Sequence, residues 1–199
     1  MTRLLRWLTL PVLALVLSGC GYNAIQAADE RTRASWSEVV NQYQRRADLI
    51  PNLVNTVKGF ADQEREVLTA VTEARAKASQ VRVDPADPAS LKAFEQTQAG
   101  MSSALSRLLV TVENYPQLKS DANFRDLQAQ LEGTENRIAV ARKRYIDSIE
   151  AYNVLIRQMP ANLTAMVFGY DTKPGFTVEN ERAIERAPSV DFGRKAPAN

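Results

Sequence analysis

The residue with the clearest chemistry in this chain is its only cysteine, Cys20. It ends the run Leu17-Ser18-Gly19-Cys20, which resembles the lipobox cleaved by the lipoprotein signal peptidase. Ser18 and Gly19 are small enough to let a peptidase reach the backbone, and the Cys20 thiol would carry the lipid through a thioether. Because each buried lipid CH₂ contributes roughly 0.8 kcal/mol, an anchor of several acyl chains would hold the protein on a membrane.

The segment before the cysteine has the pattern of an export signal. Arg3 and Arg6 form a basic start, and an apolar run follows from Leu8 to Leu17. This run is shorter than the roughly twenty residues that a spanning helix needs. We expect residues 1–19 to be a lipoprotein signal peptide and residues 20–28 to be the lipidated cysteine and a short tether. An ordinary secretory signal and an uncleaved membrane helix are the alternatives.

These features predict a bacterial protein that is anchored to a membrane by palmitate-type acyl chains and faces away from the cytoplasm. Gly21 follows the cysteine, where an aspartate would resemble a signal for retention in the inner membrane. In a Gram-negative host we therefore expect the outer membrane, with the protein facing the periplasm.

The remaining composition gives little support to catalysis. The chain has no histidine and its one cysteine is committed to the lipid, which excludes Cys/His and Ser/His/Asp arrangements and the usual zinc sites. Its eight glycines form no phosphate-binding loop. We predict no metal, no cofactor and no enzymatic activity. Glu64 lies on an apolar helical stripe, where a buried carboxylate would need Arg107 or Arg137 as a partner, unless it reaches solvent at the edge of the stripe.

The charge balance argues against nucleic acid as a partner. Removing residues 1–19 lowers Lys+Arg from 25 to 23 and leaves Asp+Glu at 23, so the mature side chains carry no net charge. Charges of both signs alternate along the chain instead of forming a basic patch. With its cysteine acylated the mature chain has no disulfide, and its stability must come from packing.

Apolar residues recur at alternating steps of three and four, which indicates helices packed at shallow angles. Four such stripes are present: Trp36, Val40, Tyr43, Ala47 and Ile50; Leu53, Val57, Phe60, Glu64, Val67, Val71, Ala74 and Ala78; Leu91, Phe94, Gln98, Met101, Leu105, Leu108, Val112 and Tyr115; and Phe124, Leu127, Leu131, Thr134, Ile138, Ala141, Tyr145, Ser148, Tyr152, Leu155 and Met159. They predict an all-α antiparallel four-helix up-and-down bundle over residues 29–160. Residues 161–199 would form a juxtamembrane segment and an extended tail, with a short helical turn near 179–186.

The boundary between the first two helices depends on Pro51. If the chain reverses at residues 46–48, Asp48 becomes the cap, Pro51 falls in a first turn, and four helices of similar length result. We prefer this arrangement. The alternative is one long helix kinked at Pro51, because the apolar register continues through that residue. Further along, Asp87 and Pro88 should begin the third helix, Pro116 should follow its end, and Ser120 or Asn123 should cap the fourth.

Several sequence runs resemble the LemA family of membrane-associated helical proteins. They are residues 45–54 (RRADLIPNLV), 57–60 (VKGF), 73–76 (EARA), 106–109 (SRLL), 113–116 (ENYP), 135–139 (ENRIA), 142–145 (RKRY), 152–153 (YN), 168–169 (FG) and 187–192 (APSVDF). The resemblance implies a helical bundle of the four-helix type and membrane association, but no particular reaction. LemA-like proteins often carry an uncleaved N-terminal membrane helix, whereas this chain has a lipobox.

Within the first of these runs, Arg45, Arg46, Asp48 and Asn52 form a candidate interaction patch. The competing interpretation is a cap and salt bridges that fix a first helical turn. Together these features favour a non-catalytic interaction module of the cell envelope, held on a membrane through Cys20 and contacting an unidentified envelope protein. A lipid- or peptide-binding carrier is the alternative function, and self-association is compatible with either.

Overall fold

The structure, a computed structural model, describes the backbone of residues 2–176 and the side chains of residues 21–176. The described chain is helical and contains no β-strand. Its helices are α1 (Thr2–Phe60), α2 (Arg65–Gln80), α3 (Pro88–Val112), α4 (Pro116–Ser120), α5 (Ala122–Arg157) and α6 (Ala161–Phe168).

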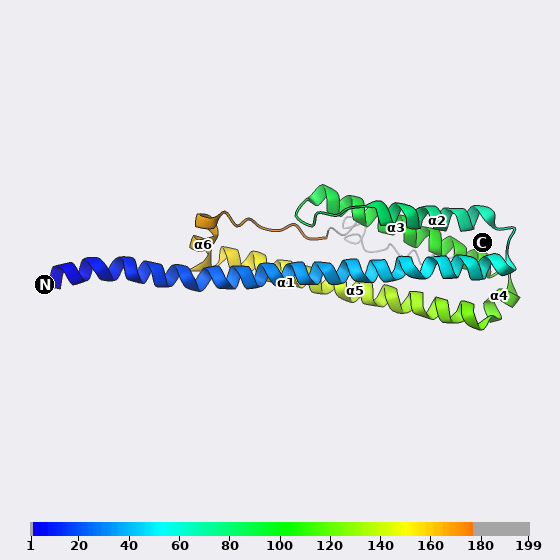
Figure 1. The fold of residues 1–199 in the computed structure, drawn as a ribbon, viewed down its shortest axis with the longest axis horizontal. Helices are drawn as coiled ribbons and strands as arrows, with labels where there is room; N and C mark the ends of the chain where they lie inside the picture. Colours follow the sequence, from blue (N-terminus) through cyan, green and yellow to red (C-terminus); the bar gives the residue numbers. More distant parts are fainter. Residues whose placement is uncertain (1, 177–199) are drawn as a thin grey trace, which may run out of the picture.

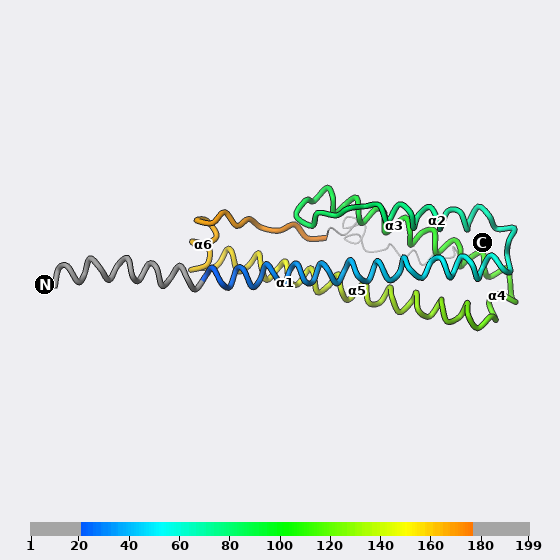
Figure 2. The backbone as a smooth tube through the Cα atoms, viewed as in Figure 1, coloured from blue at the N-terminus to red at the C-terminus, as the bar shows by residue number. Residues whose placement is uncertain are grey.

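A long antiparallel pair, α1 and α5, forms the axis of the molecule (Figure 1). The shorter α2 and α3 pair with each other and cover the half of α1 that is remote from the N-terminus (Figure 2). The small α4 connects α3 to α5 at the remote end, and α6 lies at the opposite end against α1 and α5. The prediction of four helices of similar length is therefore wrong, because α1 has 59 residues and α2 has 16.

The chain does not reverse at residues 46–48, and α1 continues through Pro51 to Phe60. The long-helix alternative is therefore right about Pro51 but wrong that the first two helices are joined, because α2 begins separately at Arg65. A proline has no backbone N–H, so the carbonyl four residues earlier loses its helical donor. Here that carbonyl belongs to Ala47, and Arg75 of α2 donates its Nε–H to it at 2.9 Å. A side chain from the neighbouring helix thus replaces the hydrogen bond that Pro51 cannot make.

The true reversal between α1 and α2 lies at residues 61–64. The backbone N–H of Ala61 still donates to Val57, and that of Glu64 donates to Ala61, which closes a tight turn. This turn interrupts the stripe of apolar residues that predicted one helix from Leu53 to Ala78. Neither glycine nor proline occurs in residues 61–64, so the sequence carries no ordinary breaker there.

The predicted start of the third helix is confirmed, and the predicted caps of the fourth are wrong. The Asp87 carboxylate accepts from the N–H groups of Ala89 and Ser90, with Pro88 at the first helical position. At the start of α5 the capping residue is Asp121, whose Oδ1 accepts from the Phe124 N–H at 2.9 Å. It lies between the two residues, Ser120 and Asn123, that were expected to serve.

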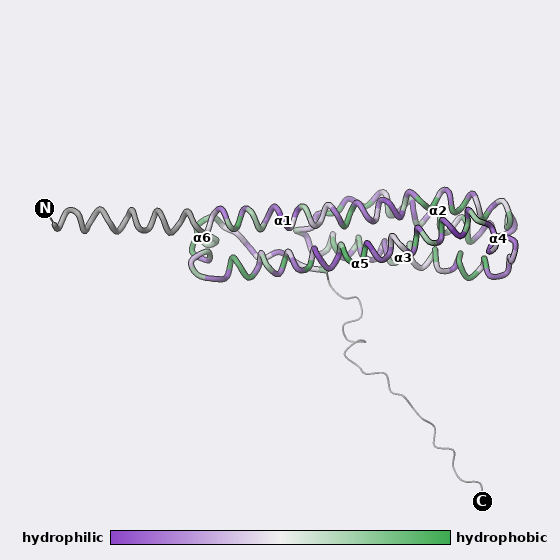
Figure 3. The backbone as a smooth tube through the Cα atoms, turned by 90° about the horizontal axis from the view of Figure 1, so that it is seen from below, coloured by the Kyte–Doolittle hydropathy of each residue, from purple (hydrophilic) through white to green (hydrophobic). Residues whose placement is uncertain are grey.

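Buried apolar residues form three clusters along the axis, and hydropathy alternates along the long helices accordingly (Figure 3). The remote cluster joins α1, α2, α3 and α5; the middle cluster is aromatic; the third, nearest the N-terminus, joins α1, α5 and α6. Two details of the predicted stripes are wrong. Val39 is buried in place of Val40, and after Tyr145 the buried positions of α5 are Ile149 and Ile156 in place of Ser148 and Leu155.

No boundary is visible at residue 29, where the helical domain was expected to begin. Residues 21–28 belong to α1, and Ile25 is fully buried against α5 and α6. The segment expected to be a short tether is thus an ordered part of the helical body. The side chains of Leu17, Ser18, Gly19 and Cys20 lie outside the described residues, as does the helical turn expected near residues 179–186.

Candidate functional site

A buried arginine, Arg46, joins three helices near the middle of the molecule. Its side chain extends from α1 and the residue is 1% exposed. One guanidinium nitrogen donates to Glu135 Oε1 of α5 at 2.6 Å and to Ser102 Oγ of α3 at 3.0 Å, and the other donates to the side-chain oxygen of Gln98. Because a guanidinium has a fixed planar fork of donors, these bonds fix the relative positions of α1, α3 and α5.

The polar network continues from Arg46 towards the C-terminal half of α5, where Arg142 lies. The Arg46 guanidinium lies 5.1 Å from the centre of the Tyr43 ring, and the Tyr43 hydroxyl accepts from Arg142 at 3.3 Å. Arg142 also forms a salt bridge of 3.1 Å with Glu95, which is buried. A groove of about 560 Å³ follows these side chains along the surface between α3 and α5. Each arginine is paired with a carboxylate, so the network binds helices together without leaving a free cationic site.

The four residues of the candidate interaction patch are therefore divided by the structure. Arg45, Asp48 and Asn52 are exposed and follow one another at helical spacings of three and four, so they share one outer face of α1. Arg46 points the other way and has a structural partner on each neighbouring helix. The expected first-turn cap is absent because α1 does not start there, and Asp48 instead accepts from Gln44 at 2.8 Å.

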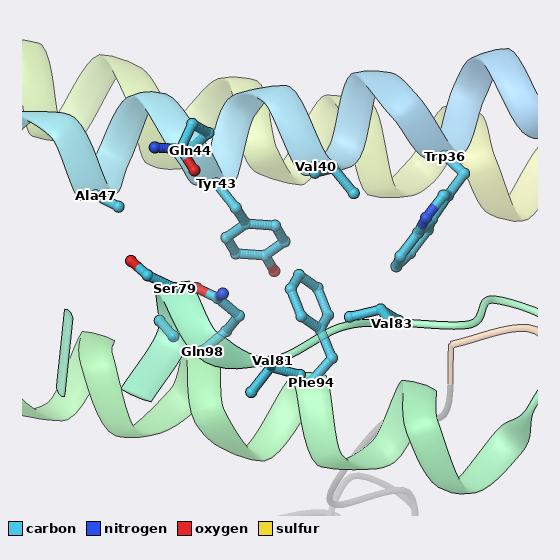
Figure 4. Close-up of a pocket in the computed structure, with 11 residues that line it drawn as sticks. Trp36, Val40, Tyr43, Gln44, Ala47, Ser79, Val81, Val83, Phe94 and Gln98 are labelled. Atoms are coloured by element: carbon cyan, nitrogen blue, oxygen red, sulfur yellow. The ribbon is translucent and has the colours of Figure 1, made fainter. Parts of the chain in front are cut away.

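An apolar pocket of about 330 Å³ opens where the α2–α3 pair ends (Figure 4). Its walls are Trp36, Val40 and Tyr43 of α1, Val81 and Val83 of the α2–α3 connection, and Phe94 of α3, with a few polar groups at the rim. The rings of Tyr43 and Phe94 meet edge to face with their centres 5.0 Å apart. Pockets of this size and lining suit a small apolar group.

The C-terminal segment that follows α6 runs back along the axis towards this pocket (Figure 1). Asn153 fixes it to α5 through two hydrogen bonds with the backbone of Lys173, at 2.8 and 3.0 Å. The Lys173 ammonium pairs with Asp29 at 2.7 Å, and Phe176 packs against Trp36 and Tyr145. Residues 170–176 therefore cover the middle cluster where α2 and α3 no longer reach it. This stretch was expected to be extended, and residues 171–176 indeed form neither helix nor strand.

Four tyrosines, among them Tyr145 and Tyr115, have raised pKa values. Burial raises the pKa of Tyr145 to about 12, because the ionised phenolate would lose its hydration in the aromatic cluster. The pKa of Tyr115 is raised mainly because its hydroxyl donates to the Glu64 carboxylate at 2.9 Å. Glu64 is half-buried and pairs with Tyr115, and not with Arg107 or Arg137, the partners considered for a buried carboxylate.

At the end of the molecule nearest the N-terminus, α6 is packed directly on the backbone of α1. A Cβ atom added at Gly21 would lie 2.8 Å from Thr164 Oγ1 and 3.1 Å from the Cα of Ala161. The rings of Tyr22 and Phe168 are tilted against each other by 54° with their centres 5.2 Å apart, and Gln26 donates to the Tyr170 hydroxyl. Residues 159–170 were expected near Cys20, and α6 does contact the residue that follows it.

Among the side chains that the structure describes, no group of three or more carboxylates is arranged to hold a metal ion. No helix, over the residues whose side chains are described, combines the length and apolarity required to cross a membrane.

These features define an all-helical protein built on one long helix, with its helices joined by a buried arginine network. The chain belongs to the LemA family, whose family model matches residues 35–192. It is 26% identical over 168 residues to magnetosome proteins MamQ 1 and MamQ 2 of Paramagnetospirillum magneticum, and 27% identical to magnetosome protein MamQ of Magnetospirillum gryphiswaldense. These alignments cover 75% of this chain and 62% of each relative, so the chain spans somewhat less than two thirds of their length.

Sequence reasoning missed the structural roles of two arginines. Arg46 lies beside Ala47 on the inner side of the stripe, which is a signal for burial, but its partners Gln98 and Glu135 are remote in sequence. Arg75 could have been found by asking which donor replaces the missing N–H of Pro51, although no local pattern identifies the helix that supplies it.

Proposed function

We propose that this protein is a non-catalytic, lipid-anchored module of the bacterial cell envelope that presents a helical surface to a protein partner. LemA family membership supports membrane association. The observation that carries the proposal is the continuity of α1, which runs without a break from the cysteine to Phe60. An anchor at Cys20 would be joined rigidly, with no flexible linker, to the remote end of the molecule.

The dimensions of α1 indicate what such an arrangement does. From Gly21 to Phe60 the helix is about 60 Å long at 1.5 Å per residue. The antiparallel α5 and the arginine network would stiffen it along this length. A surface near the middle or remote end of α1 would be held at a fixed height above the membrane, where an envelope protein could contact it.

The exposed face formed by Arg45, Asp48 and Asn52 is the candidate contact surface. It combines both charges with an amide, and it lies on the one helix that leads directly to the proposed anchor. Arg46, behind this face, would fix its orientation relative to α3 and α5 without contacting the partner.

Site-specific photocrosslinking in cells tests this contact. A photoreactive amino acid replaces Asn52 on the candidate face and, as a matched control, Arg144 on the exposed side of α5. We expect one near-stoichiometric envelope protein to be captured from Asn52 and not from Arg144. Equal capture from both positions, or none from either, would remove the face from consideration. Turnover of an envelope substrate by the purified chain would overturn the non-catalytic assignment.

Acylation of Cys20 has its own test. Cells are labelled with palmitate while producing the original chain or the Cys20→Ser variant. We expect label in the original chain and none in the variant. Continued labelling of Cys20→Ser would show that the lipid is attached elsewhere or that the label is not specific.

A second candidate, a carrier for a lipid or peptide, is favoured by the pocket between Trp36, Val83 and Phe94. Trp36 lines this pocket, so occupation by an apolar chain should change its fluorescence. Titration of the unacylated mature chain with a long-chain fatty acid is the test, with Ser79→Phe, which places a large ring at the rim without adding a second indole, as the blocked control. Unchanged Trp36 emission at saturating fatty acid would argue against the carrier function.

A further inference from the structure

Helix α6 is apolar on both of its faces. The inner face, formed by Ala161, Thr164 and Ala165, is buried against α1 and α5. The opposite face carries Leu163, Met166 and Val167, and the last two are 79% and 78% exposed. A helix at a protein surface normally has a polar outer face, and one that is apolar all round is normally buried or in contact with lipid.

The apolar surface extends beyond α6 itself. Phe168, the last residue of α6, is exposed, and so are Met159 and Tyr22, which adjoin the helix in sequence and in space. Residues 159–170 contain no charged side chain. Contiguous exposed apolar surface of this kind marks a contact site, because water solvates it poorly.

The position of α6 decides which contact is favoured. Thr164 and Ala161 touch Gly21, the residue immediately after Cys20, so α6 lies at the point where the helical body meets its N-terminal anchor (Figure 1). Because residues 21–28 are helical and packed, the chain provides no slack that would lift α6 away from an anchored Cys20. Tyr22 and Tyr170 flank the helix, and tyrosine is enriched at membrane–water interfaces.

We propose that α6 is a second membrane contact, an interfacial helix whose outer face, Leu163, Met166 and Val167, inserts among the lipids beside the anchor. The proposal rests on the N-terminal anchor of the proposed function. It adds the orientation of the molecule relative to the bilayer, which the anchor alone would not fix. With α6 fixed on α1 through Gly21, insertion of its outer face holds the long axis at a defined angle to the bilayer. The insertion is driven by apolar contact, so it does not depend on anionic lipid or on low salt.

Quenching by brominated lipid measures this insertion directly. The acylated chain is purified from host membranes and reconstituted in phosphatidylethanolamine–phosphatidylglycerol vesicles containing lipid brominated in its acyl chains. Trp36 is replaced by phenylalanine, as is Trp7, which removal of residues 1–19 would also eliminate. One tryptophan is then introduced by Val167→Trp on the outer face of α6. Val110→Trp, at an equally exposed valine on α3, is the matched control. Thermal unfolding in detergent checks that both variants remain folded.

We expect the fluorescence of the Val167→Trp variant to fall by about half or more in brominated vesicles, equally at low and high salt, and that of Val110→Trp to be unchanged. Adding Leu163→Glu and Met166→Glu to the Val167→Trp variant should abolish most of the quenching, with little change in unfolding temperature.

The contrary outcomes separate this inference from the anchor. Vesicle-bound protein without quenching of the Val167→Trp variant would overturn the inference and leave the anchor in place. An unquenched but blue-shifted emission would assign the face to a second copy or another protein, and would equally overturn it. Failure of the chain to remain with the vesicles would overturn both.

Discussion

The replacement of a helical hydrogen bond by Arg75 makes a quantitative prediction through a double-mutant cycle. Pro51 frees the carbonyl of Ala47, a residue that is almost completely buried, and Arg75 donates to that carbonyl at 2.9 Å. Arg75→Ala should therefore leave a poorly hydrated acceptor without a donor. A buried unsatisfied group costs about 1–3 kcal/mol, and we expect the lower half of this range because Arg75 is half-exposed and water can enter.

Restoring the helical donor should cancel that cost. Pro51→Ala supplies a backbone N–H that can donate to Ala47, and it removes the steric conflict of an internal proline. The variant should be more stable than the original chain by about 1–3 kcal/mol. In the Pro51→Ala background, Arg75→Ala should cost only a few tenths of a kcal/mol, so the coupling energy between the two positions is about 1 kcal/mol.

Urea unfolding of the unacylated mature chain, followed by circular dichroism, measures the four free energies of unfolding. Arg65→Ala, on the same helix but with a highly exposed side chain, is the control and should change stability by less than about 0.5 kcal/mol. Equal costs of Arg75→Ala in the two backgrounds would refute the reasoning. Arg75 would then stabilise α2 by packing alone, and the Ala47 carbonyl would be hydrated.

Three other features give predictions that unfolding experiments can check. Arg46→Ala should lower the free energy of unfolding by about 2–4 kcal/mol, because Gln98 and Ser102 lose their donor. The side chain of the third partner, Glu135, is 49% exposed and can rehydrate, so a loss above this range would contradict the reasoning. The pKa of Tyr145 is raised to about 12 in the folded state, so its contribution to the free energy of unfolding is complete below pH 10. Between pH 10 and 12 this contribution decreases by about 1.4 kcal/mol per pH unit. Tyr145→Phe should therefore flatten the alkaline fall of stability, and an unchanged slope would contradict this assignment. A Cβ at Gly100 would meet nothing within 4 Å, so Gly100→Ala should stabilise α3 by about 0.5–1 kcal/mol. Gly21→Ala should instead loosen α6, which would be measured as faster amide hydrogen exchange in residues 161–168. The same sign of effect at both positions would rule out the packing argument.

The parts of the fold that sequence predicts well are those set by local chemistry. Apolar periodicity identified the buried face of α3, from Leu91 through Val112, and most of that of α5. The cap at Asp87 was predictable because a carboxylate followed by proline has few other uses. Family membership was evident from runs such as residues 45–54, and the family model confirms it.

The parts that sequence predicted wrongly depend on contacts between remote residues. Pro51 is a local helix breaker, and it is accommodated because Arg75, 24 residues later, provides the missing donor. The reversal at residues 61–64 has no glycine or proline to mark it. Gly59 and Gly100 lie inside helices, yet a Cβ there would meet nothing within 4 Å, whereas a Cβ at Gly21 would make the shortest contacts of any glycine that the structure describes.

If Cys20 is acylated as we propose, two unrelated requirements meet at Gly21. In a bacterial lipoprotein the residue after the acylated cysteine is part of the sorting signal that directs the protein to the inner or the outer membrane. Here α6 also packs directly against Gly21, and even a methyl group at this position would collide with Ala161 and Thr164. Gly21→Asp, which would change this sorting signal, would therefore also displace α6. The chain could move to a different membrane only together with a compensating change in residues 161–164, so its destination and its packing would have to evolve together.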